Sequence, residues 1–363
     1  MLTQDRGGPV DVTTRLLATL REQGHEAVLF GPAPARGAEL VRGAHVPLAV
    51  GHKGDLRAAR AARAALRDFA PDVVHAQDRR AGLVAAGLRA APVVHTYHGV
   101  PEDVSQEWFA GRAGAAAPSR YTRTVLAADA ALARAVTRTV VPADAMGRFL
   151  RERLRMPARR IEHIDNGVLT GEPGPVVHRV RRLLFVGLMV PRKGVLTLLE
   201  AIARPGVLPP GAVLDIAGDG PALPDARAYL AGPGATVRDR VRFLGFRTDV
   251  PDLVRAYDAL VLPSEMEQQP VALAEAMAAG RPVVATDVGG VREMLDVPGA
   301  GGFVVPPGDP AALGAALGRL FAAGDLADYG ADLRARAVQR YSARACADAH
   351  LGLYQRLSST VPV

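Results

Sequence analysis

Two carboxylates stand eight positions apart in the stretch PSEMEQQPVALAEAMAAG, which covers residues 263–280. Proline suits the first turn of a helix, and it biases the residue before it away from helical conformation. We therefore expect a helix that begins at about Pro270 and ends at Gly280, a typical helix-stop residue. Glu267 then lies on the loop before the helix, and Glu275 lies about one and a half turns into it.

The start of this predicted helix suits an anion. The backbone N–H groups of 268–272 lie at the positive end of the helix dipole. Carboxylates on both sides of a phosphate site would accept hydrogen bonds from a ligand with hydroxyls on both sides of its phosphate, as in a sugar nucleotide. The simpler interpretation is one glutamate that favours the helix dipole and one solvated glutamate. Taken alone, the stretch favours the simpler interpretation.

A second candidate site is the loop within FVGLMVPRKGVLTLLEA, residues 185–201. We expect a strand before the loop and a helix after it, with Arg192 and Lys193 between them. Only Lys53 and Lys193 among the 44 basic residues are lysines. A lysine in such an arginine-rich chain indicates a place where a compact point charge suits the site better than a planar guanidinium. Cations at the carboxyl end of a strand predict a diphosphate clamp. The loop lacks the spacing of a Walker P-loop.

The first half offers two weaker candidates. Gly7 and Gly8 precede an amphipathic helix expected over 11–23, so a ligand can approach the backbone where that helix begins. The run VVHTYHG, residues 93–99, places His98 at the carboxyl end of a strand. A lone histidine is more often structural than catalytic. No spacing of histidine and carboxylate residues predicts a metal site, and we expect no metal and no other cofactor.

Short β-branched runs alternate with helical segments along the whole chain, which indicates parallel sheets covered by helices on both faces. Eleven predicted strands are too many for one compact sheet in 363 residues, so we predict two doubly wound α/β domains. The predicted strands are 27–30, 72–76, 92–98, 138–141, 161–164, 182–187, 213–218, 241–245, 259–263, 282–286 and 303–306.

The segment 166–178, rich in glycine and proline, marks the boundary between the domains. We predict a first domain over 1–168, a second over 169–340, and a C-terminal helical segment over 341–363 that packs back on the first domain. Ligands of paired α/β domains bind beyond the carboxyl ends of the strands, so the expected site is a cleft between the domains.

The formal net charge is +7, and the excess lies in residues 1–168, which hold 24 basic and 17 acidic residues. A solvated arginine-rich surface is the simpler interpretation, and an anionic membrane surface is the alternative. Nucleic acid is not expected, because no aromatic-interleaved binding motif accompanies the arginines. Without a membrane-length apolar run or a signal sequence, we expect a cytoplasmic protein, with peripheral contact at the inner face of the membrane left open.

Together these stretches resemble the retaining glycosyltransferases of the GT-B fold, in particular the large family 4 group. Two glutamates separated by seven residues are the signature of that family. The resemblance covers nearly the whole chain, through GG (7–8), PDVVHAQ (71–77), HG (98–99), DNGV (165–168), FVGLMVPRKG (185–194), AGDGP (217–221), VRFLGF (241–246), LPSEMEQQPVALAEAMAAGRPVVATDVGGVREML (262–295) and GGFVVPPGDPAAL (301–313).

The resemblance implies an enzyme that transfers a hexosyl unit, with retention, from a nucleotide-diphosphate sugar to a hydroxyl acceptor. It implies two Rossmann-like domains, the first for the acceptor and the second for the donor. Glu275 would accept from the ribose and Glu267 would face the hexose. Lys193 would neutralise the leaving diphosphate, and His98 would lie beside the transferred sugar. Further donor contacts are implied for Gly8, Arg192, Phe246, Arg247, Gln268, Gln269, Pro270 and Val271.

The chain departs from the family pattern at three places. Leu188 stands where many relatives have an arginine, and Arg192 is the candidate substitute. Gln268 and Gln269 replace a glycine and a bulky apolar residue, which makes donor choice the property most affected. Few residues precede Gly7, so we expect that the natural start lies upstream or was clipped. These departures motivate one rival, a non-catalytic sugar-nucleotide-binding protein of the same fold. The acceptor, the sugar and the base are not predicted.

Overall fold

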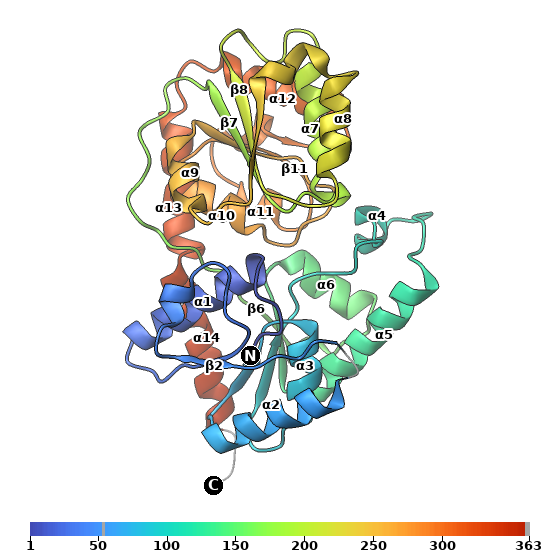
Figure 1. The fold of residues 1–363 in the computed structure, drawn as a ribbon, viewed down its shortest axis with the longest axis vertical. Coiled ribbons are helices and arrows are strands. Elements are labelled where there is room, and N and C mark those ends of the chain that lie inside the picture. Colours follow the sequence, from blue (N-terminus) through green and yellow to red (C-terminus); the bar gives the residue numbers. More distant parts are fainter. Residues whose placement is uncertain (53–54, 360–363) are drawn as a thin grey trace. The chain divides into compact units, whose positions relative to one another are not determined.

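The computed structural model describes residues 1–52 and 55–359, so Lys53 and the last four residues of the predicted C-terminal segment lie outside the described residues. The chain divides into two compact units (Figure 1). Unit 1 comprises Met1–Gly167 and the chain from Ala343 onward, and unit 2 comprises Val168–Ser342. The predicted boundaries at 168/169 and 340/341 differ from these by one and two residues.

Unit 2 is built on a six-stranded sheet in the order β12-β11-β10-β7-β8-β9, and every neighbouring pair is parallel. The chain starts in the middle of the sheet and winds to one edge and then to the other, as in a doubly wound fold. The strands are β7 (Arg182–Val186), β8 (Val213–Ala217), β9 (Val241–Gly245), β10 (Ala259–Leu262), β11 (Val283–Thr286) and β12 (Val304–Val305).

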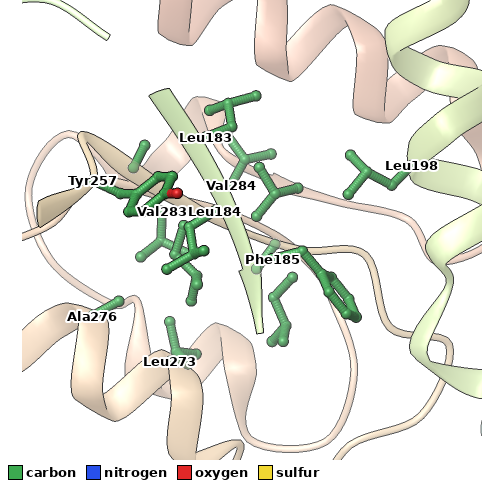
Figure 2. Packing of buried hydrophobic residues seen from close by; sticks show 14 of the residues in the cluster. Leu183, Leu184, Phe185, Leu198, Tyr257, Leu273, Ala276, Val283 and Val284 are labelled. Carbon is green, nitrogen blue, oxygen red and sulfur yellow. The ribbon is translucent and has the colours of Figure 1, made fainter. Parts of the chain in front are cut away.

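The central strand β7 shows why this sheet needs helices on both faces. Leu183, Leu184 and Phe185 are consecutive and all are buried. Successive strand residues point to opposite faces, and Figure 2 shows Leu184 on the side of Leu273 with Phe185 on the other side of the strand. A continuous apolar run therefore requires cover on both faces.

That cover in unit 2 comes from helices that follow the strands in turn. Short 3₁₀ turns accompany them. The helices are α7 (Val195–Ala203), α8 (Leu223–Ala231), α9 (Val250–Ala256), α10 (Val271–Ala278), α11 (Val291–Met294), α12 (Pro310–Ala322) and α13 (Ala327–Arg340), and the 3₁₀ turns are η3 (Pro191–Lys193), η4 (Ala235–Arg240) and η5 (Ala300–Gly302).

Unit 1 holds a four-stranded parallel sheet, β3-β4-β5-β6, and a separate parallel pair, β1-β2. The first residues of the chain hydrogen-bond to both: Leu2 N donates to Phe30 O at 2.9 Å, and Met1 O accepts from Gln77 N at 3.0 Å. The strands are β1 (Leu29–Gly31), β2 (His45–Pro47), β3 (Val74–Ala76), β4 (Val93–Thr96), β5 (Arg138–Val141) and β6 (Ile161–His163).

The last helix of the chain, α14 (Ala343–Ser358), packs within unit 1. Leu353 and Leu357 join a core cluster with Val94 of β4, and Ala347 packs with Leu16 of α1. The other elements of the unit are α1 (Gly8–Glu22), η1 (Ala38–Val41), α2 (Leu56–Phe69), α3 (Arg79–Ala85), α4 (Gln106–Phe109), α5 (Arg120–Ala135), α6 (Asp144–Glu152) and η2 (Ala158–Arg160).

All eleven predicted strands are found in the described residues, with ends that differ by at most two residues. The prediction missed β2, His45–Pro47, because this short strand is partly exposed and ends in a proline. Within residues 1–52 and 55–359, no helix has both the length and the apolar character needed to cross a membrane.

A fully buried carboxylate in the core of unit 2, that of Asp215, yields a stability prediction. Asp215 of β8 is fully buried, accepts from Arg242 Nε at 2.7 Å and Nη2 at 2.5 Å, and accepts from the Tyr257 hydroxyl. Asp215→Ala leaves the phenol without its acceptor and opens a cavity, so we expect a loss of about 2–3 kcal/mol. Urea unfolding measures it. Asp239→Ala, at a side chain that is 92% exposed, is the matched control. An equal effect of both variants would contradict the prediction.

Candidate active site

The loop between β10 and α10 adopts the predicted geometry. Pro270 is the N-cap residue of α10, with φ −69° and ψ 121°, and the helix runs over Val271–Ala278. Glu267 lies on the loop, and Glu275 is the fifth residue of the helix and only 7% exposed. The proline thus separates a loop carboxylate from a buried helical one.

The two sequence motifs of unit 2 meet in an ion pair. Lys193 Nζ lies 2.5 Å from Glu267 Oε1, and the same oxygen accepts from Ser264 Oγ at 2.8 Å. Ser264 is fully buried, and its carbonyl accepts from the Thr286 hydroxyl. Because two donors hold Oε1, the orientation of the carboxylate is set, and Oε2 remains to accept from a ligand hydroxyl.

Two glycines allow the loops to approach one another. Gly194 has φ +68°, and a Cβ there would lie 2.0 Å from Pro263 O. Gly289 has φ +55°, and a Cβ there would lie 2.2 Å from Glu267 O. Sequence reasoning did not assign Ser264 or Gly289 a role, although the Gly-Gly pair at 289–290, shortly after the expected strand 282–286, was the available signal.

The two glutamines after Glu267 are both buried, each 6% exposed. Gln268 Nε2 lies 3.8 Å from Met266 Sδ, and Gln268 O accepts from Gly290 N at 2.7 Å. Gln268 Oε1 is buried and has no hydrogen-bond partner among the described residues. A buried amide oxygen in this state is stabilised by any ligand donor that reaches it.

The other predicted donor residues of unit 2 occupy more exposed places. Phe246 follows β9 and is 54% exposed. Arg247 forms a two-point ion pair with Asp249, at 2.8 and 2.5 Å, which raises the pKa of Arg247 and lowers that of Asp249. Arg192 is half-buried, and its carbonyl accepts from Glu265 N at 2.8 Å. Leu188, which stands at the expected arginine position, is 58% exposed.

Of the two predicted residues of unit 1, His98 lines a pocket of about 620 Å³ and Gly8 does not. Gly8 is the first residue of α1 and directly precedes Pro9, which lines the pocket together with His98. Two arginines of the lining are already engaged. Arg79 pairs with Asp129 at 2.5 and 2.8 Å, and Arg80 donates to the Gly51 carbonyl at 2.6 Å. The pocket therefore presents neutral polar groups more than free cations.

Burial keeps four histidines of unit 1 neutral: His75, His95, His98 and His350. Burial, with a smaller contribution from His95, lowers the pKa of His98 to about 3. Burial also lowers the pKa of His95 and of His350 to about 4 and that of His75 well below its usual value. At neutral pH each of these rings carries one N–H and one lone pair, so His98 can donate at one nitrogen and accept at the other.

Because these four histidines are neutral in the folded protein, we expect the fold to lose stability at acid pH. In the unfolded chain they titrate near 6.5, so below that pH the unfolded state binds more protons than the folded state. Stability is complete above pH 6.5 and falls toward pH 4, by about 1.4 kcal/mol per pH unit for each histidine. We expect the Tm from calorimetry to be level from pH 8 to 7 and to fall from pH 6.5 to 5. His95→Gln should reduce the slope and His25→Gln, at an exposed site, should not. A level Tm down to pH 5 would contradict the assignment.

The close approach at Gly289 predicts a second effect. Gly289→Ala forces the backbone of Glu267 and Gln268 to shift, because the new Cβ would lie 2.2 Å from one carbonyl oxygen and 2.8 Å from the other. We expect a cost of at least about 2 kcal/mol by urea unfolding. Gly318→Ala is the control: its Cβ meets nothing within 4 Å in helix α12, and it should stabilise by about 0.5–1 kcal/mol. A neutral Gly289→Ala would show that the loop tolerates the shift.

Within the described ranges 1–52 and 55–359, no group of three or more histidine, cysteine, aspartate or glutamate side chains is arranged to hold a metal ion. The expectation of a reaction without a metal stays a prediction.

The fold is that of GT-B glycosyltransferases. HepE of Anabaena superposes with a TM-score of 0.76 over 98% of each chain at 20% identity. Sucrose-phosphate synthase of Thermosynechococcus elongatus superposes with a TM-score of 0.78 over 98% of this chain and 94% of that chain at 22% identity. Two family models match the sequence, Glycosyltransferase Family 4 over residues 6–172 and Glycosyl transferases group 1 over residues 180–323. The chain belongs to the group 1, family 4 glycosyltransferases.

Curated relatives share the family but match over part of their length. The alpha-D-kanosaminyltransferase of Streptomyces kanamyceticus is 33% identical over 178 residues, which is 48% of this chain and 45% of that protein. The glycogen synthase of Mycobacterium tuberculosis is 29% identical over 264 residues, which is 69% of this chain and 60% of that protein. The chain thus matches about half of the length of these relatives.

Proposed function

We propose that the protein is a glycosyltransferase that moves a hexosyl unit from a nucleotide-diphosphate sugar to a hydroxyl of an acceptor, with retention of the anomeric configuration. Family membership supports transferase activity. The nucleotide-sugar donor is supported by crystal structures of HepE with UDP and with UDP-glucose. Retention is the usual outcome in the family that the chain resembles. The acceptor and the base stay open.

The observation that carries the proposal is the ion pair of Lys193 and Glu267. It lies on the loops that follow β7 and β10, directly before α10, whose N-terminal end favours an anion. A cation, a positive helix end and a carboxylate are what the diphosphate and the sugar hydroxyls of such a donor require.

The transfer needs no covalent contribution from the protein. The bond from C1 of the sugar to the diphosphate oxygen breaks, and a bond from C1 to the acceptor oxygen forms on the same face. The acceptor proton passes to an oxygen of the leaving phosphate. Lys193 and the start of α10 stabilise the charge on the departing diphosphate, and positioning of the two substrates supplies much of the remaining acceleration.

The other predicted residues have supporting roles in this proposal. Glu275 accepts from the ribose hydroxyls, and Glu267 Oε2 accepts from the hexose. The unsatisfied oxygen of Gln268 is suited to a further sugar hydroxyl. His98, neutral at physiological pH, contacts the transferred sugar by hydrogen bonding. Gly8 lets a ligand approach the start of α1. Pro270 and Val271 set the position of the amides at the start of α10, with Gln269 packed beside them.

A non-catalytic sugar-nucleotide-binding protein of the same fold is the alternative, and it is not favoured. The matched relatives carry transferase or synthase names. Lys193, Glu267, Glu275 and His98 are all retained. The change at Leu188 removes one cation, and an apolar, exposed side chain there does not replace its charge.

Membrane contact and a cytoplasmic location remain proposals. Several arginines of the basic first half bind the protein's own carbonyls: Arg134 donates to Arg155 O at 2.8 Å, and Arg160 donates to Val136 O at 3.0 Å. Arg153 donates to Trp108 O at 3.0 Å. Part of the positive charge therefore stabilises the fold itself. This supports the simpler interpretation, in which the arginines need no anionic partner.

Loss of the Glu275 carboxylate should weaken nucleotide binding. A thermal-shift panel of UDP-, GDP-, ADP- and dTDP-sugars first selects the donor, because a bound ligand stabilises the fold by mass action. Calorimetry with the matching nucleoside diphosphate then compares Glu275→Ala with the parent protein. We expect about 10- to 100-fold weaker binding, because hydrogen bonds to a charged acceptor disappear.

The control is Glu265→Ala, which removes an exposed carboxylate from the same loop and should leave the affinity unchanged. Thermal melting of Glu275→Ala without ligand separates loss of binding from loss of folding. Unchanged affinity in a folded Glu275→Ala variant would remove this residue from the donor site. No response to any nucleotide sugar would count against the proposed function.

A further inference from the structure

A relay of hydrogen bonds through Gln77, His75 and Tyr354 runs from His98 to the last helix of unit 1. His98 Nε2 lies 3.0 Å from Gln77 Oε1, and Gln77 Nε2 lies 3.3 Å from His75 Nδ1. That nitrogen lies 2.6 Å from the Tyr354 hydroxyl, and His75 Nε2 lies 2.7 Å from Thr96 Oγ1. The relay therefore joins the ends of β3 and β4 to α14, and its link from His75 to Tyr354 spans 279 positions of sequence.

The phenol of Tyr354 sets which groups donate and which accept along this relay. Burial raises the pKa of Tyr354, so the side chain keeps its proton and needs an acceptor. His75 Nδ1 is that acceptor, at 2.6 Å. The neutral ring of His75 then carries its proton on Nε2 and donates it to Thr96 Oγ1.

The orientation of Gln77 determines which nitrogen of His98 carries the proton. Because His75 Nδ1 accepts, the group of Gln77 that faces it is the amide NH₂, and the carbonyl oxygen of Gln77 faces His98. A carbonyl oxygen only accepts, so His98 Nε2 must carry the proton. The lone pair of the neutral ring is then on Nδ1.

We propose that Tyr354, His75 and Gln77 are positioning residues that hold His98 as its Nε2–H tautomer and present the Nδ1 lone pair to a hydroxyl of the sugar in the pocket of unit 1. The part that concerns the sugar rests on the proposed function, whereas the tautomer does not. A histidine held in the opposite tautomer would meet a hydroxyl with an N–H and would accept nothing at that nitrogen.

The packing of α14 keeps this relay in place. Leu353, next to Tyr354, lies in one core cluster with Val94 of β4. The ring of His350 packs against the ring of His75 at 5.2 Å, and its Nδ1–H donates to the Cys346 carbonyl at 2.8 Å. The helix that orients His75 is thus anchored on β4, the strand that ends two residues before His98.

Nitrogen NMR of the intact protein tests the proposal without any ligand. Long-range ¹H–¹⁵N spectra of ¹⁵N-histidine-labelled protein at pH 7.5 distinguish a protonated from an unprotonated ring nitrogen, and His98→Gln assigns the His98 signals. We expect one tautomer, with the proton on Nε2. In Tyr354→Phe and in Gln77→Leu we expect the His98 signals to move toward the average of the two tautomers.

Tyr121→Phe is the matched control, since it removes an exposed phenol from the lining of the same pocket, and it should leave the His98 signals unchanged. Circular dichroism checks that each variant is folded, and Tyr354→Phe keeps the test valid if Gln77→Leu does not fold. A proton on Nδ1, or a mixture of tautomers, in the parent protein would overturn the proposal. So would unchanged His98 signals in both relay variants.

A second readout separates the relay from the proposed function. Tyr354→Phe should leave the calorimetric affinity for the nucleoside diphosphate within about twofold of the parent value, because no member of the relay is assigned to the nucleotide. Failure of every nucleotide sugar to bind would count against the transferase proposal and leave the tautomer result intact. A loss of nucleotide affinity in folded Tyr354→Phe would contradict a role limited to His98.

Discussion

Burial of parallel strands on both faces is the constraint on which this structure depends. A strand such as β7, with Leu183, Leu184 and Phe185 all buried, has no face for solvent, so a helix must follow it and return the chain. In unit 2 the loops after β7, β10 and β11 therefore leave the same edge of one sheet. Lys193, Glu267 and Gly289 stand on those three loops.

Charge is treated differently in the two units. In unit 2, Lys193 and Glu267 form a partly exposed pair with side chains 21% and 10% exposed, where a polyanion can compete for the ammonium. In unit 1, the pocket arginines are held by Asp129 and by carbonyls, and burial keeps His95 and His98 neutral. One site is suited to an anionic donor, and the other is suited to an uncharged polyhydroxyl group.

The last helix has more than a packing role. Its apolar side supplies Leu353 and Leu357 to the core of unit 1, and its Tyr354 hydroxyl reaches His75. A side chain near the end of the sequence thereby affects the protonation pattern of His98, which lies near the end of β4. Core packing sets the distance, and the need of each buried polar group for a partner sets the direction of the protons.

Sequence by itself determined the predicted strands and the start of the helix that carries Glu275. Apolar runs showed all eleven expected strands, and Pro270 separated Glu267 from the helix that carries Glu275, because these signals depend on neighbours in the chain. Only the tertiary structure decided the contacts between distant segments. These are Lys193 with Glu267, Gly289 close to the Glu267 carbonyl, and Tyr354 with His75. Side-chain partners and close backbone contacts depend on how distant segments pack, which local periodicity does not encode.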